Sequence, residues 1–304
     1  MSGFHALAPG KVNLCLFLGG PREDGRHELV TLFQPVSLAD EVTLSTVAGG
    51  GEDEVVCPGV EGPNLAARAL AELRARGWDG PRVRIEITKR IPVAAGMAGG
   101  SADAAAVLRL AAAARGAPAA VMVEAARVLG ADVPSQLAPG PALGTGAGEI
   151  VTPVRARAPH AFVILPSAAQ LATPAVFAEA DRLGLPRSEA GLAERRHALE
   201  TALRVAPGLP AELLVNDLEP AARSLCPSID GALDHARGLG ADVVLVCGSG
   251  PTVAGLFWGE DAPARARIAA ATARGRFPTA GAAVPVDAGF AAVRDTHRQP
   301  RPAQ

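Results

Sequence analysis

A glycine-rich segment ahead of an alanine-rich stretch is the strongest chemical signal in this sequence of 304 residues. The segment reads Pro92-Val93-Ala94-Ala95-Gly96-Met97-Ala98-Gly99-Gly100-Ser101-Ala102. Phosphate binding needs backbone N–H groups in a tight concave turn and a helix N-terminus aimed at the anion, and the three glycines permit that close approach. The Ser101 hydroxyl can add a hydrogen bond. Because the segment is neither a Walker A sequence nor a dinucleotide fingerprint, a plain turn is an equal alternative when it is taken alone.

Lys11 is one of only two lysines in the chain, and it begins an otherwise apolar strand with Asn13 on the same face. Burial of a lysine in such surroundings is unfavourable because the ammonium loses its hydration. A neighbouring anion or carboxylate can offset that loss. Asp132, which apolar residues surround just past an expected helix end, is a candidate partner. Such a pair could deprotonate or polarise a hydroxyl nucleophile. The alternatives are a surface lysine at a strand edge and an ordinary turn aspartate.

A second glycine-rich turn, Gly248-Ser249-Gly250-Pro251, lies between two expected strands, where its backbone amides could approach a ligand. A plain hairpin is the simpler interpretation of this turn by itself. A further glycine-containing stretch, residues 144–149, is interpreted as structural because no helix start follows it.

Periodicity predicts a first half that alternates strands and helices. Period-2 patterns indicate strands over 12–18, around Val42 and over 83–88, and residues 21–27 form a loop, with a hairpin as the expected context. Helices are expected over residues 65–73, with Asn64 as N-cap, over 102–114 and over 119–129.

A proline- and arginine-containing connector over residues 153–159 marks the expected domain boundary. The predicted domains are therefore residues 1–155 and 156–293, followed by a tail over 294–304 that we expect to be disordered. The second half predicts strands at 162–165, 242–247, 253–258 and near 284, and helices over 174–183, over 190–206 and after 261. This order indicates an α+β sandwich.

The overall composition is that of a folded protein with no strongly charged partner. The formal net charge is −2, which suggests neither nucleic acid nor an anionic membrane as the main partner. No run of about 18 apolar residues and no signal peptide are found, so a cytoplasmic protein is expected. The four cysteines form no C-x-x-C pair and are expected to be buried free thiols, and the histidines show no spacing typical of a metal site. A monomer or a weak homodimer is expected.

All three motifs, in this order and at these separations, resemble those of the GHMP kinase superfamily. Lys11-Val12-Asn13 matches its first motif, Pro92 to Ser101 its phosphate loop, and Gly248-Ser249-Gly250-Pro251-Thr252 its third motif. Within the superfamily the sequence is most similar to the kinases that phosphorylate a cytidylated methylerythritol for isoprenoid precursor synthesis. Four stretches carry this finer resemblance: residues 9–14, 22–29, 31–34 and 129–134.

The resemblance implies an N-terminal domain like ribosomal protein S5, a ferredoxin-like C-terminal sandwich, and an active site in the cleft between them. It also implies ATP and Mg²⁺ as cofactors. Asp132 matches the catalytic base, Lys11 the residue that orients and acidifies the acceptor hydroxyl, and Asn13 a ligand of the methylerythritol part. The phosphate loop from Pro92 to Ala102 would hold ATP.

The resemblance further implies a substrate pocket for the cytidine diphosphate part. His27 would read the cytosine edge, Thr173 and Phe177 would close over the cytidine, and the turn Gly248-Ser249-Gly250 would contact substrate. Arg26 stands where the family commonly has a tyrosine that stacks on cytosine. A guanidinium plane also stacks on aromatic faces, so Arg26 can replace the ring or can alter the pocket.

Two other functions stay open at this point. One is another kinase of the superfamily, such as a homoserine or mevalonate kinase, against which the stretches around residues 24–27 and 130–134 argue. The other is a catalytically silent ligand-binding relative, which the presence of both Lys11 and Asp132 disfavours.

Overall fold

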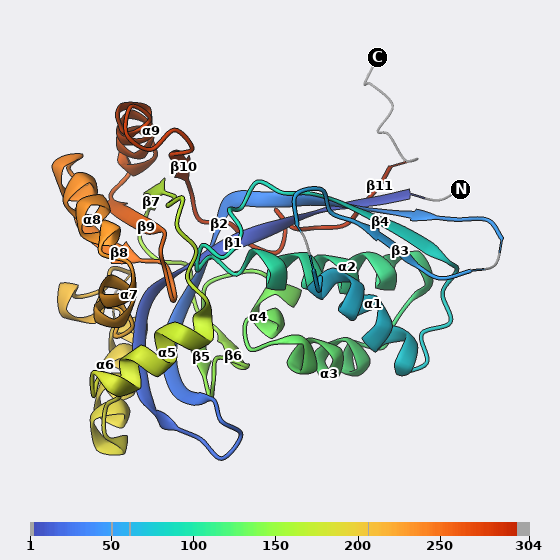
Figure 1. Ribbon diagram of the computed structural model, residues 1–304, viewed down its shortest axis with the longest axis horizontal. Helices are drawn as coiled ribbons and strands as arrows, with labels where there is room; N and C mark the ends of the chain where they lie inside the picture. Colours follow the sequence, from blue (N-terminus) through green and yellow to red (C-terminus); the bar gives the residue numbers. More distant parts are fainter. Residues whose placement is uncertain (1–2, 50, 61, 206, 297–304) are drawn as a thin grey trace.

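The structure is a computed structural model that describes residues 3–49, 51–60, 62–205 and 207–296 (Figure 1). The strands of its first sheet are β1 (Gly3–Pro21), β2 (His27–Thr46), β3 (Glu54–Val56), β4 (Val83–Thr88), β5 (Ala142–Thr145), β6 (Ile150–Pro153) and β11 (Arg294–Asp295). Their order is β11-β1-β2-β4-β3, and β5 joins β2 to β6. Figure 1 shows four helices together on one side of this sheet: α1 (Leu65–Ala75), α2 (Gly99–Arg115), α3 (Ala119–Leu129) and α4 (Val133–Leu137).

The second half builds an antiparallel sheet with the order β10-β7-β9-β8. Its strands are β7 (His160–Leu165), β8 (Val243–Val246), β9 (Val253–Trp258) and β10 (Gly281–Ala283). The helices are α5 (Thr173–Arg182), α6 (Glu189–Val205), α7 (Glu219–Leu225), α8 (Ser228–Gly238) and α9 (Ala262–Ala273), with a 3₁₀ turn at Ala211–Leu213. In Figure 1, α8 and α9 lie on the side of this sheet away from the first half.

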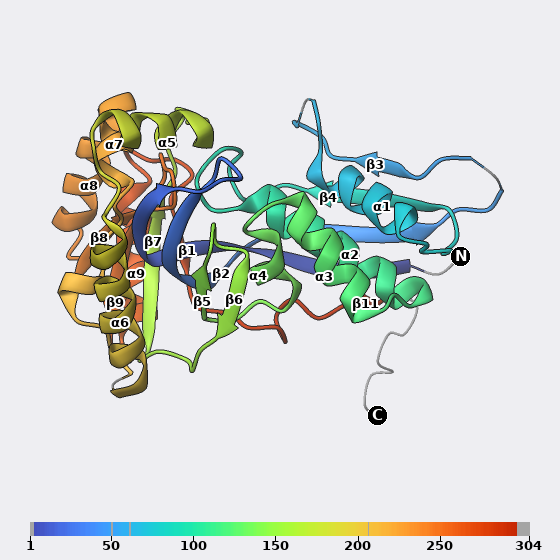
Figure 2. The ribbon, with the colours of Figure 1, turned by 90° about the horizontal axis from the view of Figure 1, so that it is seen from below.

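The long hairpin of β1 and β2 runs through both halves, as Figure 2 shows. Near its tip, Leu16, Leu18 and Leu29 belong to the same apolar core as strand β7 and helix α8 of the second half. The backbone N–H of Leu16 donates to the carbonyl of Val215 at 2.9 Å, and the N–H of Asp217 donates back to the carbonyl of Leu16 at 2.9 Å. The hairpin therefore fixes the position of one half against the other.

Local sequence explains where the helices near the site begin. Asn64 caps α1, because its side-chain oxygen accepts the N–H of Ala66 at 2.8 Å. Helix α2 carries nine buried residues, most of them alanines, so its backbone can lie close to the strands of the first sheet. The expected start at residue 102 is corrected to Gly99, because the glycine pair belongs to the first turn of the helix.

Most elements expected from periodicity are confirmed; β1, β2 and β7 are longer than predicted, and β8 is shorter than the expected residues 242–247. The stretch 144–149 is the turn between β5 and β6, as expected of a structural segment. The sequence did not predict β3, β5, β6, α4, α7 and α8. The expected helix over residues 190–206 is α6, and residue 206 lies outside the described residues. The boundary over 153–159 stays a prediction.

The chain end requires a second correction. Arg294 and Asp295 pair with β1, and the N–H of Thr296 donates to the carbonyl of Gly3 at 3.0 Å. The tail expected to be disordered therefore does not begin at residue 294, while residues 297–304 lie outside the described part of the chain. Among the helices that the structure describes, none has the length and apolar character needed to cross a bilayer.

Candidate active site

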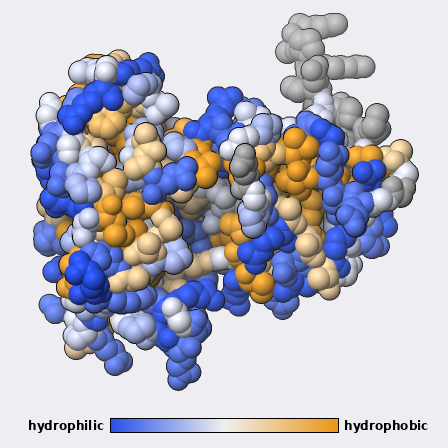
Figure 3. Space-filling model, viewed as in Figure 1, coloured by the Kyte–Doolittle hydropathy of each residue, from blue (hydrophilic) through white to orange (hydrophobic). Residues whose placement is uncertain are grey.

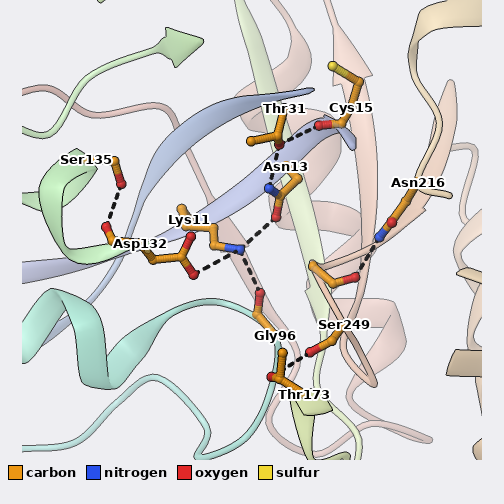
Figure 4. A network of polar contacts seen from close by, with 11 residues as sticks. Lys11, Asn13, Cys15, Thr31, Gly96, Asp132, Ser135, Thr173, Asn216 and Ser249 are labelled. Carbon is orange, nitrogen blue, oxygen red and sulfur yellow. Dashed lines mark hydrogen bonds and ion pairs between the residues drawn. The ribbon is translucent and has the colours of Figure 1, made fainter. Parts of the chain in front are cut away.

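Lys11 lies on β1, and its ammonium is the centre of a buried polar network (Figure 4). The lysine is only 4% exposed. Its Nζ donates to Asn13 Oδ1 at 2.7 Å and to the carbonyl of Gly96 at 3.3 Å, and it lies 3.8 Å from Asp132 Oδ2. The structure thus brings together the lysine and the aspartate that the sequence singled out as a pair.

Asp132 presents its carboxylate to the cleft rather than to the adjacent helix. It precedes the short helix α4, yet its side chain makes no capping hydrogen bond. The Ser135 hydroxyl donates to its backbone carbonyl at 2.8 Å, which fixes the turn. With its side chain one-third exposed, the carboxylate can accept a proton from a ligand in the cleft.

The glycine-rich segment forms the loop from β4 to α2. Ala94, Gly96 and Ala98 have φ angles of 54°, 74° and 57°, in the left-handed region. These turns wrap the loop around the start of α2, where the first N–H groups have no partner within the helix. Together with the positive end of the helix dipole, such groups bind phosphate. The loop joins the lysine strand directly, because the N–H of Lys11 donates to the carbonyl of Met97 at 3.0 Å.

The turn from Gly248 to Pro251 packs against the phosphate loop. A Cβ on Gly96 would lie 1.9 Å from the carbonyl oxygen of Cys247, and one on Gly248 would lie 2.7 Å from the carbonyl oxygen of Gly96. The two backbones can approach this closely only because both positions are glycine. The contact lies beside the Lys11 ammonium. The plain hairpin is therefore not the whole explanation of this turn.

Asn216 and Thr173 hold this second turn in place. The amide nitrogen of Asn216 donates to the carbonyls of Val246 and Gly248 at 2.8 and 2.7 Å. The hydroxyls of Thr173 and Ser249 lie 3.0 Å apart. Because the carbonyl of a trans peptide points opposite to the following N–H, the bond to Gly248 turns the N–H of Ser249 away from Asn216.

A cavity of about 490 Å³ joins these groups between the two halves. Figure 3 shows the surface hollowed between the halves, with hydrophobic and hydrophilic residues interspersed around it. The predicted residues that line the cavity are Lys11, Asn13, Pro92, Val93, Ala94, Ala95, Gly96, Ala98, Gly99, Gly100, Ser101, Asp132, Thr173, Phe177, Gly248 and Ser249. A larger hollow, of about 1180 Å³, shares Pro92 and Val93 with this cavity, but its wall includes neither Lys11 nor Asp132.

Five predicted residues are not part of the cavity wall: Arg26, His27, Met97, Ala102 and Gly250. Met97 and Ala102 are fully buried, so they support the loop from behind. Arg26 is exposed on the turn of the β1–β2 hairpin, where its Nε lies 3.4 Å from Asp24 Oδ2.

His27 is buried beside the cavity and is already engaged. Its Nε2 lies 2.8 Å from Asp181 Oδ1, and its ring centroid lies 5.1 Å from that of Phe177. The hairpin turn and α5 thus meet through these three side chains at one end of the cavity. The roles of Arg26 and His27 toward a base stay predictions.

A second buried ion cluster supports the phosphate loop, and the sequence analysis missed it. Lys89 Nζ donates to Asp103 Oδ2 at 2.7 Å and also binds Asp40, whose Oδ1 accepts the N–H of Ile91 at 2.8 Å. Burial raises the pKa of the Asp103 carboxyl to about 7, although the Lys89 ammonium acts in the opposite direction. Within the described residues, Asp103 Oδ1 is buried without a hydrogen-bond partner. The only signal in the sequence was that Lys89 is the second of two lysines.

Other missed residues lie on the cavity wall near the start of α2. Cys57, Asn64 and Leu65 contribute there. Thr31 and Phe33 of β2 contribute to the wall beside Asn13 and Lys11. Asn64 was predicted only as a helix cap, a role that it does fill.

The cysteines are free thiols, as expected, and three of the four are buried, whereas Cys57 is only partly buried. Burial raises the pKa of the Cys15 and Cys247 thiols to about 12, so both stay protonated near neutral pH and neither can serve as a thiolate nucleophile. Among the described residues, no group of three or more His, Cys, Asp and Glu side chains could hold a metal ion.

Comparisons with known proteins agree with this geometry. The family models described as GHMP kinases N terminal domain and GHMP kinases C terminal match residues 64–140 and 198–275. The 4-diphosphocytidyl-2-C-methyl-D-erythritol kinase of Streptomyces coelicolor is 42% identical, over 86% of this chain and 89% of that protein. The corresponding kinase of Kineococcus radiotolerans is 42% identical, over 84% and 81% of the two chains.

Solved structures extend the comparison to the fold. A crystal structure of 4-(cytidine 5'-diphospho)-2C-methyl-D-erythritol kinase superimposes with a TM-score of 0.73 at 36% identity, covering 93% of this chain and 99% of that one. A homoserine kinase from Cytophaga hutchinsonii matches with a TM-score of 0.70 over 96% of this chain and 97% of its own, at 18% identity, which shows a shared fold alone. The expected two-domain α+β fold is confirmed.

Proposed function

Because the chain belongs to the 4-diphosphocytidyl-2-C-methyl-D-erythritol kinases of the GHMP kinase superfamily, we propose that it transfers the terminal phosphoryl group of ATP to the 2-hydroxyl of 4-diphosphocytidyl-2-C-methyl-D-erythritol. This step belongs to the non-mevalonate route to isoprenoid precursors. The observation that carries the proposal is the position of Lys11 and Asp132, 3.8 Å apart, on the wall of the same cavity as the phosphate loop.

The phosphate loop and the start of α2 supply the site for ATP. Backbone N–H groups from Gly99 to Ser101 begin the helix and bind the phosphates, while Lys89 and Asp40 fix the end of β4 from which the loop departs. Mg²⁺ would enter as its complex with ATP, because the described residues offer no cluster of side chains that could hold the ion by themselves. It would supply neutralisation of the phosphate charge.

The acceptor hydroxyl lies between Asp132 and Lys11. Asp132 takes its proton, the hydroxyl oxygen forms a bond to the γ-phosphorus, and the bond from that phosphorus to the bridging oxygen of ADP breaks. The Lys11 ammonium stabilises the negative charge that develops on the attacking oxygen. Catalysis then rests on positioning and charge neutralisation, which a buried lysine with two fixed hydrogen-bond acceptors provides.

The cytidine part of the substrate binds at the end of the cavity where the hairpin turn meets α5. Phe177 offers an aromatic face there, and Thr173 lies beside Ser249 of the second glycine turn. His27, in ring contact with Phe177, is the candidate for the cytosine edge. The reducing cytoplasm is the proposed location, in keeping with four free cysteines. A monomer or a weak homodimer stays the prediction for the oligomeric state.

A coupled assay that measures the formation of ADP from MgATP tests this function. We expect turnover with 4-diphosphocytidyl-2-C-methyl-D-erythritol and none above background with homoserine or mevalonate. Asp132→Asn should lower kcat by about 10²- to 10⁴-fold and leave the KM for ATP near that of the wild type, because it removes the proton acceptor but keeps the shape.

The matched control is Asp234→Asn, whose side chain is 77% exposed on α8. Its kcat should equal that of the wild type. Turnover of homoserine or mevalonate in place of the cytidylated substrate would overturn the substrate assignment. Nucleotide binding without any turnover would point instead to a silent ligand-binding protein.

A further inference from the structure

We propose that Thr31 is a positioning residue of this active site, which acts through Asn13 to hold the ammonium of Lys11. The inference rests on the proposed function for its kinetic consequences. Its basis is a chain of three hydrogen bonds, each of 2.7 Å: Lys11 Nζ to Asn13 Oδ1, Asn13 Nδ2 to Thr31 Oγ1, and Thr31 Oγ1 to the carbonyl of Cys15 (Figure 4). Lys11, Asn13 and Thr31 are each at most 4% exposed.

The chain of hydrogen bonds can run in one direction only. An ammonium group has donors and no acceptor, so Asn13 must present its carbonyl oxygen to Lys11. Its NH₂ group then faces Thr31 and needs an acceptor there. The Thr31 hydroxyl provides a lone pair because its own proton goes to the Cys15 carbonyl, which can only accept. Thr31 therefore holds the NH₂ end of the Asn13 amide, and with it the carbonyl oxygen that meets the lysine.

The surrounding strands hold Thr31 in the required rotamer. Thr31 is paired with Leu16 of β1 on one side and with Gly144 of β5 on the other. A Cβ on Gly144 would lie 3.0 Å from the Thr31 methyl carbon and 2.5 Å from the Phe33 ring. The methyl group thus fills the space that this glycine leaves, and the hydroxyl is directed to Asn13. A β-branched side chain also has few alternative χ1 rotamers.

The fixed lysine keeps the catalytic pair apart. At 3.8 Å, Lys11 Nζ and Asp132 Oδ2 are farther apart than a hydrogen bond of 2.7–3.2 Å allows, so the carboxylate remains available to an acceptor hydroxyl. Without the acceptor on Asn13, the flexible lysine would move to Asp132 and form a direct ion pair. That contact would occupy the proton acceptor and displace the group that stabilises the attacking oxygen.

Thr31→Val and Thr31→Ser separate the hydroxyl from the shape of the side chain. Valine keeps the volume but cannot accept from Asn13, whereas serine keeps the hydroxyl. We expect kcat to fall at least about tenfold in Thr31→Val and to stay within about threefold of the wild type in Thr31→Ser, with the KM for ATP little changed in both. Thr43→Val, on the same strand with its hydroxyl 3.5 Å from the carbonyl of Glu86, is the control for loss of a strand hydroxyl.

A double-mutant cycle identifies the route of the effect. If Thr31 acts through Asn13, then Thr31→Val causes no further loss of kcat in an Asn13→Ala background. Additive losses would overturn the proposal, as would equal losses in Thr31→Val and Thr31→Ser. Thermal melting of each variant separates a loss of folded protein from a loss of turnover.

A readout independent of turnover uses the scarcity of lysine. Because Lys11 and Lys89 are the only lysines, selective ¹³C,¹⁵N-lysine labelling gives two side-chain signals, which a Lys89→Arg variant assigns. Thr31→Val should shift the Cε and Nζ signals of Lys11 and leave those of Lys89 in place, and Thr31→Ser should move neither. An unshifted Lys11 signal in Thr31→Val would refute the proposal, whatever substrate the enzyme accepts. Failure of the substrate assignment alone would leave the predicted shifts intact.

Discussion

Gly96→Ala is the most direct test of the contact between the two glycine-rich turns. The added methyl group would lie 1.9 Å from the carbonyl oxygen of Cys247, where a real Cβ stays at least 3.0 Å away. The other neighbours are the backbone nitrogen and oxygen of Gly250, each at 2.9 Å, so no flexible side chain can move aside. One of the two turns must therefore shift by about 1.1 Å.

Two effects of different size follow from this shift. An alanine with a φ of 74° in the left-handed region is destabilised by about 1–2 kcal/mol relative to glycine, which lowers the melting temperature modestly. A displacement of about 1 Å between groups that orient a reaction reduces its rate by roughly 10²-fold. The loss of kcat should therefore be much larger than the loss of stability implies.

Initial rates with MgATP and the cytidylated substrate, measured beside melting curves, separate these two effects. Gly140→Ala is the matched control, because a Cβ there has no neighbour within 4 Å and the backbone does not have a positive φ. A Gly96→Ala enzyme with kcat within about threefold of the wild type would refute the close approach of the two turns. A melt that shows the variant to be unfolded at the assay temperature would refute the small stability effect.

Two other predictions concern the ends of the cavity. Arg26→Ala should raise the KM for the cytidylated substrate about fivefold if the guanidinium stacks on cytosine, and Arg26→Tyr should restore or improve it. An unchanged KM in Arg26→Ala would show that Arg26, which is half exposed and beside Asp24, is a solvated turn residue. Cys57 is partly exposed on the wall near Asn64 and should be the first thiol alkylated in the native protein, with MgATP slowing the reaction. Peptide mapping after iodoacetamide treatment measures this, and labelling that MgATP does not slow would exclude Cys57 from the nucleotide site.

The sequence predicted the pairing of Lys11 with Asp132 because each member stands out locally. Lys11 and Asp132 are charged residues in apolar surroundings, and a charge in that position needs a partner. Thr31, Asn216 and Asp103 were missed because they are common polar residues whose partners lie elsewhere in the chain. The Asn216 amide binds carbonyls 30 and 32 positions away, and no local pattern reports such a contact.

The limits of local patterns also explain the errors in the fold. Strand β1 extends from Gly3 to Pro21, whereas alternation predicted only residues 12–18. The alternation does not extend over Pro9 or the glycines near residue 20, but the sheet accommodates them at shifts of register between Pro9 and Lys11 and between Leu18 and Pro21. The short helix α4 has five residues, too few to show a helical period.

The hairpin of β1 and β2 has a consequence for how this protein can be divided. The two regions that match family models, residues 64–140 and 198–275, both exclude it, although it carries Lys11, Asn13 and Thr31. Leu16, Leu18 and Leu29 complete the interior of the second half, so a fragment cut at the connector over 153–159 would lack part of its own core. The two regions that match family models are thus not the units in which this chain folds. During synthesis, the hairpin would emerge from the ribosome first. Its tip would be buried only after the second half had also emerged.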